Sequence, residues 1–172
     1  NGYKNCRIAV FGENSYQWIL TYFAAVCGKN LIVPIDKDIS PEGAADILTD
    51  SERRLMIDSH HYADIAQIID GMNRENVRRC SMKQLPELIA EGRKLIAAGN
   101  LEYMQENIGE DDLASIVYTS GTSGKSKGVM MSHRNLCANT YGSCDAVDIK
   151  RGTALLLLPL HHTFGLVTNV FS

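Results

Sequence analysis

The chain has 172 residues, of which 45% are hydrophobic and 22% are charged, and its formal net charge is −3. This is the composition of a globular protein with one sizeable core, so it excludes a disordered chain. The small excess of acidic residues argues against a nucleic-acid-binding surface. No apolar run approaches the ~20 residues that a membrane-spanning helix needs, so we expect no transmembrane segment.

Five cysteines are scattered along the chain, and none forms a C-x-x-C pair. Their odd number and irregular spacing predict reduced, mostly buried thiols rather than a disulfide framework or a metal site. Such thiols are typical of cytosolic proteins, and no signal peptide precedes the first predicted strand. We therefore expect a cytoplasmic protein.

The first half of the chain alternates short apolar runs with segments of helical periodicity. Asn14, followed three residues later by Gln17, resembles a capping box and predicts the start of the first helix. Ser40-Pro41-Glu42 places a cap, an N1 proline and a first-turn acid at the start of the second helix. The apolar runs predict strands at 7–11, 31–35 and 55–57, with a weaker one at 76–80.

Two further helices are predicted, one opened by His60 and His61 and one led by the capping box Ser81-Met-Lys-Gln84. Adjacent histidines point to different faces of a helix, so we interpret His60 and His61 as solvated or capping residues rather than metal ligands. Strands that alternate with helices imply parallel pairing through right-handed crossovers. The predicted fold is therefore α/β, a single domain over 1–172 with three layers and helices on both faces of a mostly parallel sheet.

The most informative stretch is Thr119-Ser-Gly-Thr-Ser-Gly-Lys-Ser-Lys-Gly128, which holds five hydroxyls, three glycines, two lysines and no acid. Glycine lets backbone N–H groups approach an anion, hydroxyls donate to phosphate oxygens, and lysine supplies positive charge. Strands predicted at 113–118 and 129–131 bracket this stretch, and Ser132 is the predicted N-cap of a helix near 133–146. The pattern predicts a loop that wraps a polyphosphate.

Two other interpretations of this loop compete with polyphosphate binding by a strand–loop–strand unit. Gly124-Lys125-Ser126 matches the end of a P-loop, but the first glycine of that motif would fall on Thr119, and a helix should follow directly. A flexible Gly/Ser hairpin would not normally lie between two apolar strands. A P-loop-like NTPase and a non-catalytic nucleotide-binding module remain the alternatives.

The segment Tyr118–Gly128 resembles the signature loop of the adenylate-forming (AMP-binding) superfamily, roughly [YF]-T-S-G-[ST]-[TS]-G-x-P-K-G. That superfamily includes acyl-CoA synthetases, luciferases and adenylation domains of peptide synthetases. Ser126 stands at its usual proline position. Downstream, Pro159-Leu-His-His-Thr-Phe-Gly165 resembles the P-x-x-H-x-x-G pattern of acyl-activating members, after an apolar strand predicted at 153–158. His162 falls on the family histidine, and its alternative role is to cap the last helix.

The resemblance implies an acid–thiol ligase of the acyl-CoA synthetase type, which joins a carboxylic acid to coenzyme A through an acyl-adenylate. It implies that ATP and Mg²⁺ are bound by the loop, with Thr122 near the metal. It also implies catalytic roles for Lys127, as a positive charge, and for His162, which lines the acyl pocket. The residues implied to bind ATP are Thr119, Ser120, Gly121, Thr122, Ser123, Gly124 and Lys127.

Other motifs of that superfamily are not found in these 172 residues, including a Tyr-Gly-x-Thr-Glu segment, a Thr-Gly-Asp segment and the C-terminal lid domain. We therefore expect a fragment of a larger AMP-binding domain, part of the large N-terminal domain of an acyl-adenylate-forming enzyme. Such a fragment is expected to be inactive alone and to self-associate through uncovered apolar faces. The segment 159–166 leans towards fatty-acyl or aryl substrates.

Overall fold

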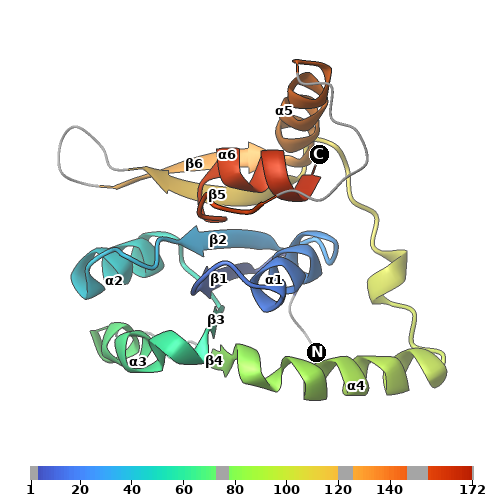
Figure 1. The fold of residues 1–172 in the computed structure, drawn as a ribbon. Coiled ribbons are helices and arrows are strands. Elements are labelled where there is room, and N and C mark those ends of the chain that lie inside the picture. The colour runs from blue at the N-terminus through green and yellow to red at the C-terminus, as the bar shows by residue number, and fades with distance from the viewer. Residues whose placement is uncertain (1–3, 73–77, 120–125, 147–154, 172) are drawn as a thin grey trace.

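The computed structural model describes residues 4–72, 78–119, 126–146 and 155–171. Six strands form one sheet in the order β4-β3-β1-β2-β5-β6 (Figure 1). Four of the described pairings are parallel, and β5 with β6 is antiparallel, so the predicted mostly parallel sheet is confirmed. The strands are β1 (Arg7–Phe11), β2 (Leu31–Ile35), β3 (Leu55–Asp58), β4 (Arg78–Ser81), β5 (Leu113–Thr119) and β6 (Lys127–Ser132).

Helices cover both faces of the sheet, which confirms the three-layer arrangement (Figure 1). One core cluster lies under α1, the start of α4, α5 and α6, and the other lies under α2 and α3. Among the described helices, none combines the length and apolar character needed to cross a bilayer. The α-helices are α1 (Tyr16–Val26), α2 (Pro41–Asp50), α3 (Ala63–Met72), α4 (Leu85–Ala97), α5 (His133–Ala146) and α6 (Thr163–Leu166); short helical turns are η1 (His60–Tyr62), η2 (Met82–Gln84), η3 (Tyr103–Gln105) and η4 (Val167–Phe171).

Strand β1 shows why the central strands are continuously apolar. Its side chains alternate between the two cores, with Ile8 and Val10 on the α1 side and Ala9 and Phe11 on the α2–α3 side. All four are buried. A strand that is buried on both faces needs apolar side chains at successive positions, so the run from Ile8 to Phe11 predicts a strand without any knowledge of its neighbours.

The start of α1 differs from the prediction. Its N-cap is Ser15, whose hydroxyl accepts the Trp18 N–H at 3.2 Å, and not Asn14. Serine and asparagine are nearly equal as N-caps, so the sequence did not distinguish them. The Asn14 side chain instead reaches the segment around Leu158, as described below.

The strand predicted at 153–158 is wrong for its described part. Residues 155–158 form no strand, and the side chains of Leu155 and Leu157 are 77% and 76% exposed. An apolar run becomes a strand only where a neighbouring strand completes its backbone hydrogen bonds. Here the carbonyl of Leu158 is bound by the Asn14 side chain. Residues 153 and 154 lie outside the described residues.

Candidate functional site

The candidate site lies at the carboxyl edge of the sheet. The parallel strands β1, β2, β3 and β5 all end at this edge, where open α/β sheets bind their ligands. The segment that joins β5 to β6 therefore begins there, beside the loop that leads from β2 into α2.

The hairpin β5–β6 holds two of the predicted phosphate-binding residues opposite one another. Thr119 pairs with Lys127 at the open end of the ladder, and both residues are exposed. A P-loop runs directly into a helix, whereas here Ser126 leads into β6. The predicted strand–loop–strand unit is thus confirmed. Ser120, Gly121, Thr122, Ser123 and Gly124 lie outside the described residues.

The hairpin is fastened to α2 by Tyr118, which the sequence pattern contains but which we did not predict as a site residue. Its hydroxyl donates to Asp50 Oδ2 at 2.6 Å. Burial and this hydrogen bond to a carboxylate raise the pKa of Tyr118, so the phenol stays a donor. A Cβ at Gly128, its cross-strand partner, would lie 3.1 Å from the Tyr118 ring. Glycine at the end of the loop motif thus leaves room for the tyrosine at its start.

The turn Pro159–Gly165 explains the spacing of the second motif. The His162 N–H donates to the Pro159 carbonyl at 3.2 Å, and α6 begins at the next residue. A Cβ at Gly165 would lie 2.5 Å from the same carbonyl, so only glycine lets α6 fold back onto the turn. His162 is exposed at the N-cap position of α6, but its side chain makes no capping hydrogen bond.

The two motifs lie on neighbouring elements. Thr163 Oγ1, next to His162, is 4.0 Å from Met131 Sδ on β6. Met131 lies four residues further along β6 than Lys127. The structure thus brings the His162 turn to the hairpin, but towards the end of β6 that is remote from the predicted loop.

His161 is the buried member of the histidine pair, and the sequence pattern did not single it out. Its side chain is 9% exposed, with Nε2 3.4 Å from Asp36 Oδ1 in the loop after β2. Burial lowers the pKa of His161, an effect that Asp36 opposes and His162 reinforces. The one signal for His161 in the sequence was that two histidines are adjacent. Neighbouring residues in a turn point in different directions, so one of the two could be buried while the other is exposed.

Comparison with known proteins assigns this architecture to a family. The family model described as "AMP-binding enzyme" matches residues 2–172. The chain belongs to the AMP-binding enzyme family. The solved N-terminal domain of FACL13 from Mycobacterium tuberculosis, bound to an inhibitor, matches this AMP-binding chain with a TM-score of 0.76 and 26% identity, over 96% of this chain and 41% of that one.

Curated AMP-binding relatives are named as ligases. The chain is 28% identical over 170 residues to the long-chain-fatty-acid–CoA ligase FadD13 of Mycobacterium tuberculosis, covering 98% of this chain and 33% of the relative. It is 36% identical over 200 residues to the long-chain-fatty-acid–CoA ligase of Salmonella typhimurium, covering 96% and 35%. ATP-bound MatB from Rhodopseudomonas palustris matches with a TM-score of 0.71 and 30% identity, over 96% and 32%. The chain spans about a third of the length of the curated relatives it matches.

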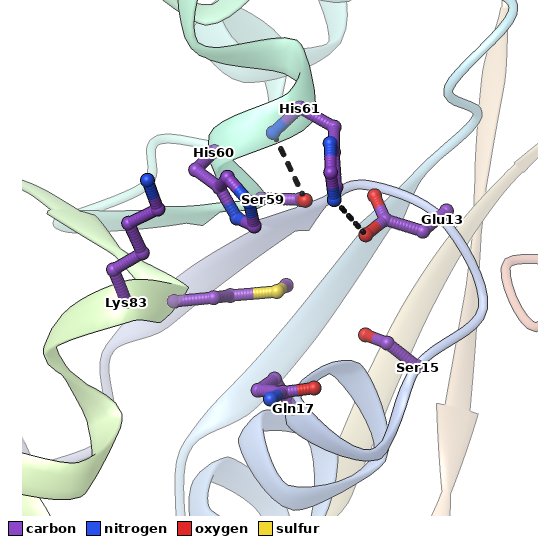
Figure 2. A pocket seen from close by; sticks show the side chains of 8 residues that line it. Glu13, Ser15, Gln17, Ser59, His60, His61 and Lys83 are labelled. Atoms are coloured by element: carbon purple, nitrogen blue, oxygen red, sulfur yellow. Dashed lines mark hydrogen bonds and ion pairs between the residues drawn. The ribbon is translucent and has the colours of Figure 1, made fainter.

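A cavity of this AMP-binding chain lies further along the same edge, where the strand order reverses between β1 and β3. Figure 2 shows the side chains of Glu13 and His61 next to each other in its lining, with Oε1 and Nε2 3.9 Å apart. Burial, His61 and Lys83 lower the pKa of His60. Within the described ranges no group of three residues could hold a metal ion. The cavity, of about 230 Å³, is lined by Glu13, Ser15, Gln17, Ser59, His60, His61, Met82 and Lys83.

Proposed function

We propose that this chain carries the ATP-phosphate-binding hairpin of an acyl-CoA ligase. Such an enzyme activates a carboxylic acid as its acyl-adenylate and then transfers the acyl group to the thiol of coenzyme A. The observation that carries the proposal is the β5–β6 hairpin, which presents Thr119 and Lys127 side by side at the carboxyl edge. The relatives named as long-chain-fatty-acid–CoA ligases support a fatty acid as the substrate.

The proposed chemistry requires positive charge and hydrogen-bond donors at the phosphates. A carboxylate that attacks the α-phosphorus of ATP brings anions together, and donors fixed on the leaving pyrophosphate lower that barrier. We assign this role to the hydroxyls of Ser120, Thr122 and Ser123, supported by Thr119 and by the charge of Lys127. Gly121 and Gly124 permit close backbone approach. The exposure of Thr119 and Lys127 fits this role, because a polyanion can reach both.

Mg²⁺ and the acyl group have their own proposed residues. The Thr122 hydroxyl would complete the shell of a bound Mg²⁺, which supplies charge neutralisation at the phosphates. His162 shapes the acyl pocket, and its exposed position on a turn beside α6 leaves its imidazole accessible. Coenzyme A is the proposed acyl acceptor.

We further propose that the chain acts as part of a longer cytoplasmic protein. Its match to about a third of each ligase supports a fragment of a larger AMP-binding domain that does not turn over alone. Val129 and Met130 of β6, and Ile96 of α4, are about half exposed or more. Uncovered apolar positions on an edge strand and a helix favour self-association of the isolated chain.

Pyrophosphate exchange in the full-length ligase tests the proposal. Thr122→Ala and Lys127→Ala should each lower ATP–pyrophosphate exchange by ~10²–10³, the usual cost of one well-placed donor. Lys125→Ala is the matched control, since Lys125 occupies the variable position of the loop pattern and should retain exchange. Undiminished exchange in both Thr122→Ala and Lys127→Ala would overturn the phosphate assignment.

A further inference from the structure

One carboxamide from the start of the chain holds the segment that leads to His162. Asn14 Nδ2 donates to the Leu158 carbonyl at 2.9 Å, and the Leu160 N–H donates to Asn14 Oδ1, also at 2.9 Å. An asparagine side chain offers both a donor and an acceptor, so it satisfies a C=O and an N–H two residues apart. The described residues 155–160 pair with no strand. The Asn14 side chain therefore supplies two hydrogen bonds of the kind that a neighbouring strand would supply.

A second side chain holds the other end of the same turn. The His161 imidazole is nine-tenths buried, with Nε2 3.4 Å from Asp36 Oδ1. The same carboxylate oxygen accepts the Asp38 N–H at 2.9 Å. This hydrogen bond from the Asp38 backbone fixes the Asp36 carboxylate in its own loop. The His161 ring lies 4.3 Å from the ring of His162, centroid to centroid. His161 is therefore placed between the β2 loop and the exposed imidazole.

We propose that Asn14 and His161 are positioning residues for His162, which together fix the turn at the carboxyl edge of the sheet. The proposal rests on the function proposed for His162. Asn14 fixes the position of the backbone from Leu158 to Leu160 relative to the loop after β1. His161 sets the orientation of the His162 imidazole, which its own ring contacts. A catalytic group displaced by 1 Å can lose about 100-fold in rate, so a loosened turn lowers kcat.

Kinetics of the full-length ligase separate positioning from mere stability. Asn14→Ala should lower kcat for acyl-adenylate formation about 10- to 100-fold with the KM for ATP unchanged, because the phosphate hairpin is untouched. Asn14→Asp keeps the acceptor for the Leu160 N–H but loses the donor to the Leu158 carbonyl. Its kcat should therefore lie between those of the wild type and Asn14→Ala. His161→Ala should lower kcat similarly. His161→Gln, which keeps a polar side chain beside Asp36, should restore part of the lost kcat.

A variant that loses stability without touching the turn serves as the matched control. Ser81→Ala removes the cap of η2, which lies away from the His162 turn, so it should lower Tm and leave kcat unchanged. If Ser81→Ala lowers kcat as much as Asn14→Ala does, the effect of Asn14 is structural and the positioning role is wrong.

Hydrogen exchange of the same full-length variants tests, without reference to activity, whether the Asn14 side chain holds the backbone at Leu158 and Leu160. Asn14→Ala should make the amide of Leu160 exchange about tenfold faster, with the buried amides of β2 unchanged. Unchanged exchange at Leu160 would show that Asn14 does not hold this backbone, whatever the activity. Faster exchange with an unchanged kcat would show that the turn is loosened without an effect on the reaction, which contradicts the positioning role of Asn14 but leaves the function proposed for His162 standing. A failure of the phosphate assignment would appear separately, in the Thr122→Ala and Lys127→Ala variants.

Discussion

The N-terminal and C-terminal regions of the sheet are held in different ways. Strands β1 to β3 lie between two apolar cores, and β1 has full parallel registers with β2 and β3. On the other side, β6 is an edge strand with exposed Val129 and Met130, and 155–158 lies outside the sheet. The proposed site residues belong to the second region. The packed region supplies a scaffold, and the loosely covered region presents the groups that would meet a substrate.

The largest expected effect is a difference in the free energy of unfolding between a substitution in the packed region and one in the loosely covered region. Trp18 is 1% exposed and stacks on Tyr22, with ring centroids 5.7 Å apart, so Trp18→Ala should lower the free energy of unfolding by ~3–5 kcal/mol. Leu155→Ala should change it by less than ~0.5 kcal/mol, since that side chain is largely exposed. Urea unfolding of the chain measures both. Equal losses would mean that 155–158 is packed and the contrast is false.

Substituting two glycines by alanine should change stability in opposite directions, with a smaller expected effect. Gly165→Ala forces a Cβ against the Pro159 carbonyl and should cost ~1–3 kcal/mol, as overpacking does. A Cβ at Gly92, inside α4, would meet nothing within 4 Å, so Gly92→Ala should stabilise by ~0.5–1 kcal/mol. Thermal unfolding of the two variants gives the signs. A stabilising Gly165→Ala would show that α6 does not fold back onto its turn.

The smallest effect concerns the fastening of the hairpin to α2. Tyr118→Phe removes the hydrogen bond to Asp50 and should cost ~1 kcal/mol. Because the pKa of Tyr118 is raised in the folded chain, its contribution is complete below the unfolded value of about pH 10 and declines as the pH rises further. The stability difference between wild type and Tyr118→Phe should therefore shrink above that pH. A difference that grows there would contradict the raised pKa.

Local patterns predicted the elements of the scaffold because their causes are local. The strands at 7–11 and 31–35 are apolar runs that end at Gly12 and Asp36, and Ser40-Pro41 begins α2 as predicted. Each of these signals lies within a few residues of the feature that it specifies.

Partners that are distant in sequence account for the errors. Arg78 and Arg79 weakened the strand prediction at 76–80, yet Arg79 lies in β4 and donates to both carboxylate oxygens of buried Asp58, at 2.7 and 2.9 Å. Asn14 looked like a helix cap, but its partners are 144 and 146 residues away. A hydrogen bond between remote residues leaves no periodic trace in the sequence.

Titration of the full-length protein with ATP and Mg²⁺ is the most direct test of the claim that the β5–β6 hairpin binds the phosphates of a nucleotide. Lys127→Ala should weaken ATP binding about tenfold or more, since it removes a charge-assisted contact. Lys125→Ala, two residues away in the same loop, should bind like wild type. Equal affinity in wild type and Lys127→Ala, or equal weakening in both variants, would contradict the account.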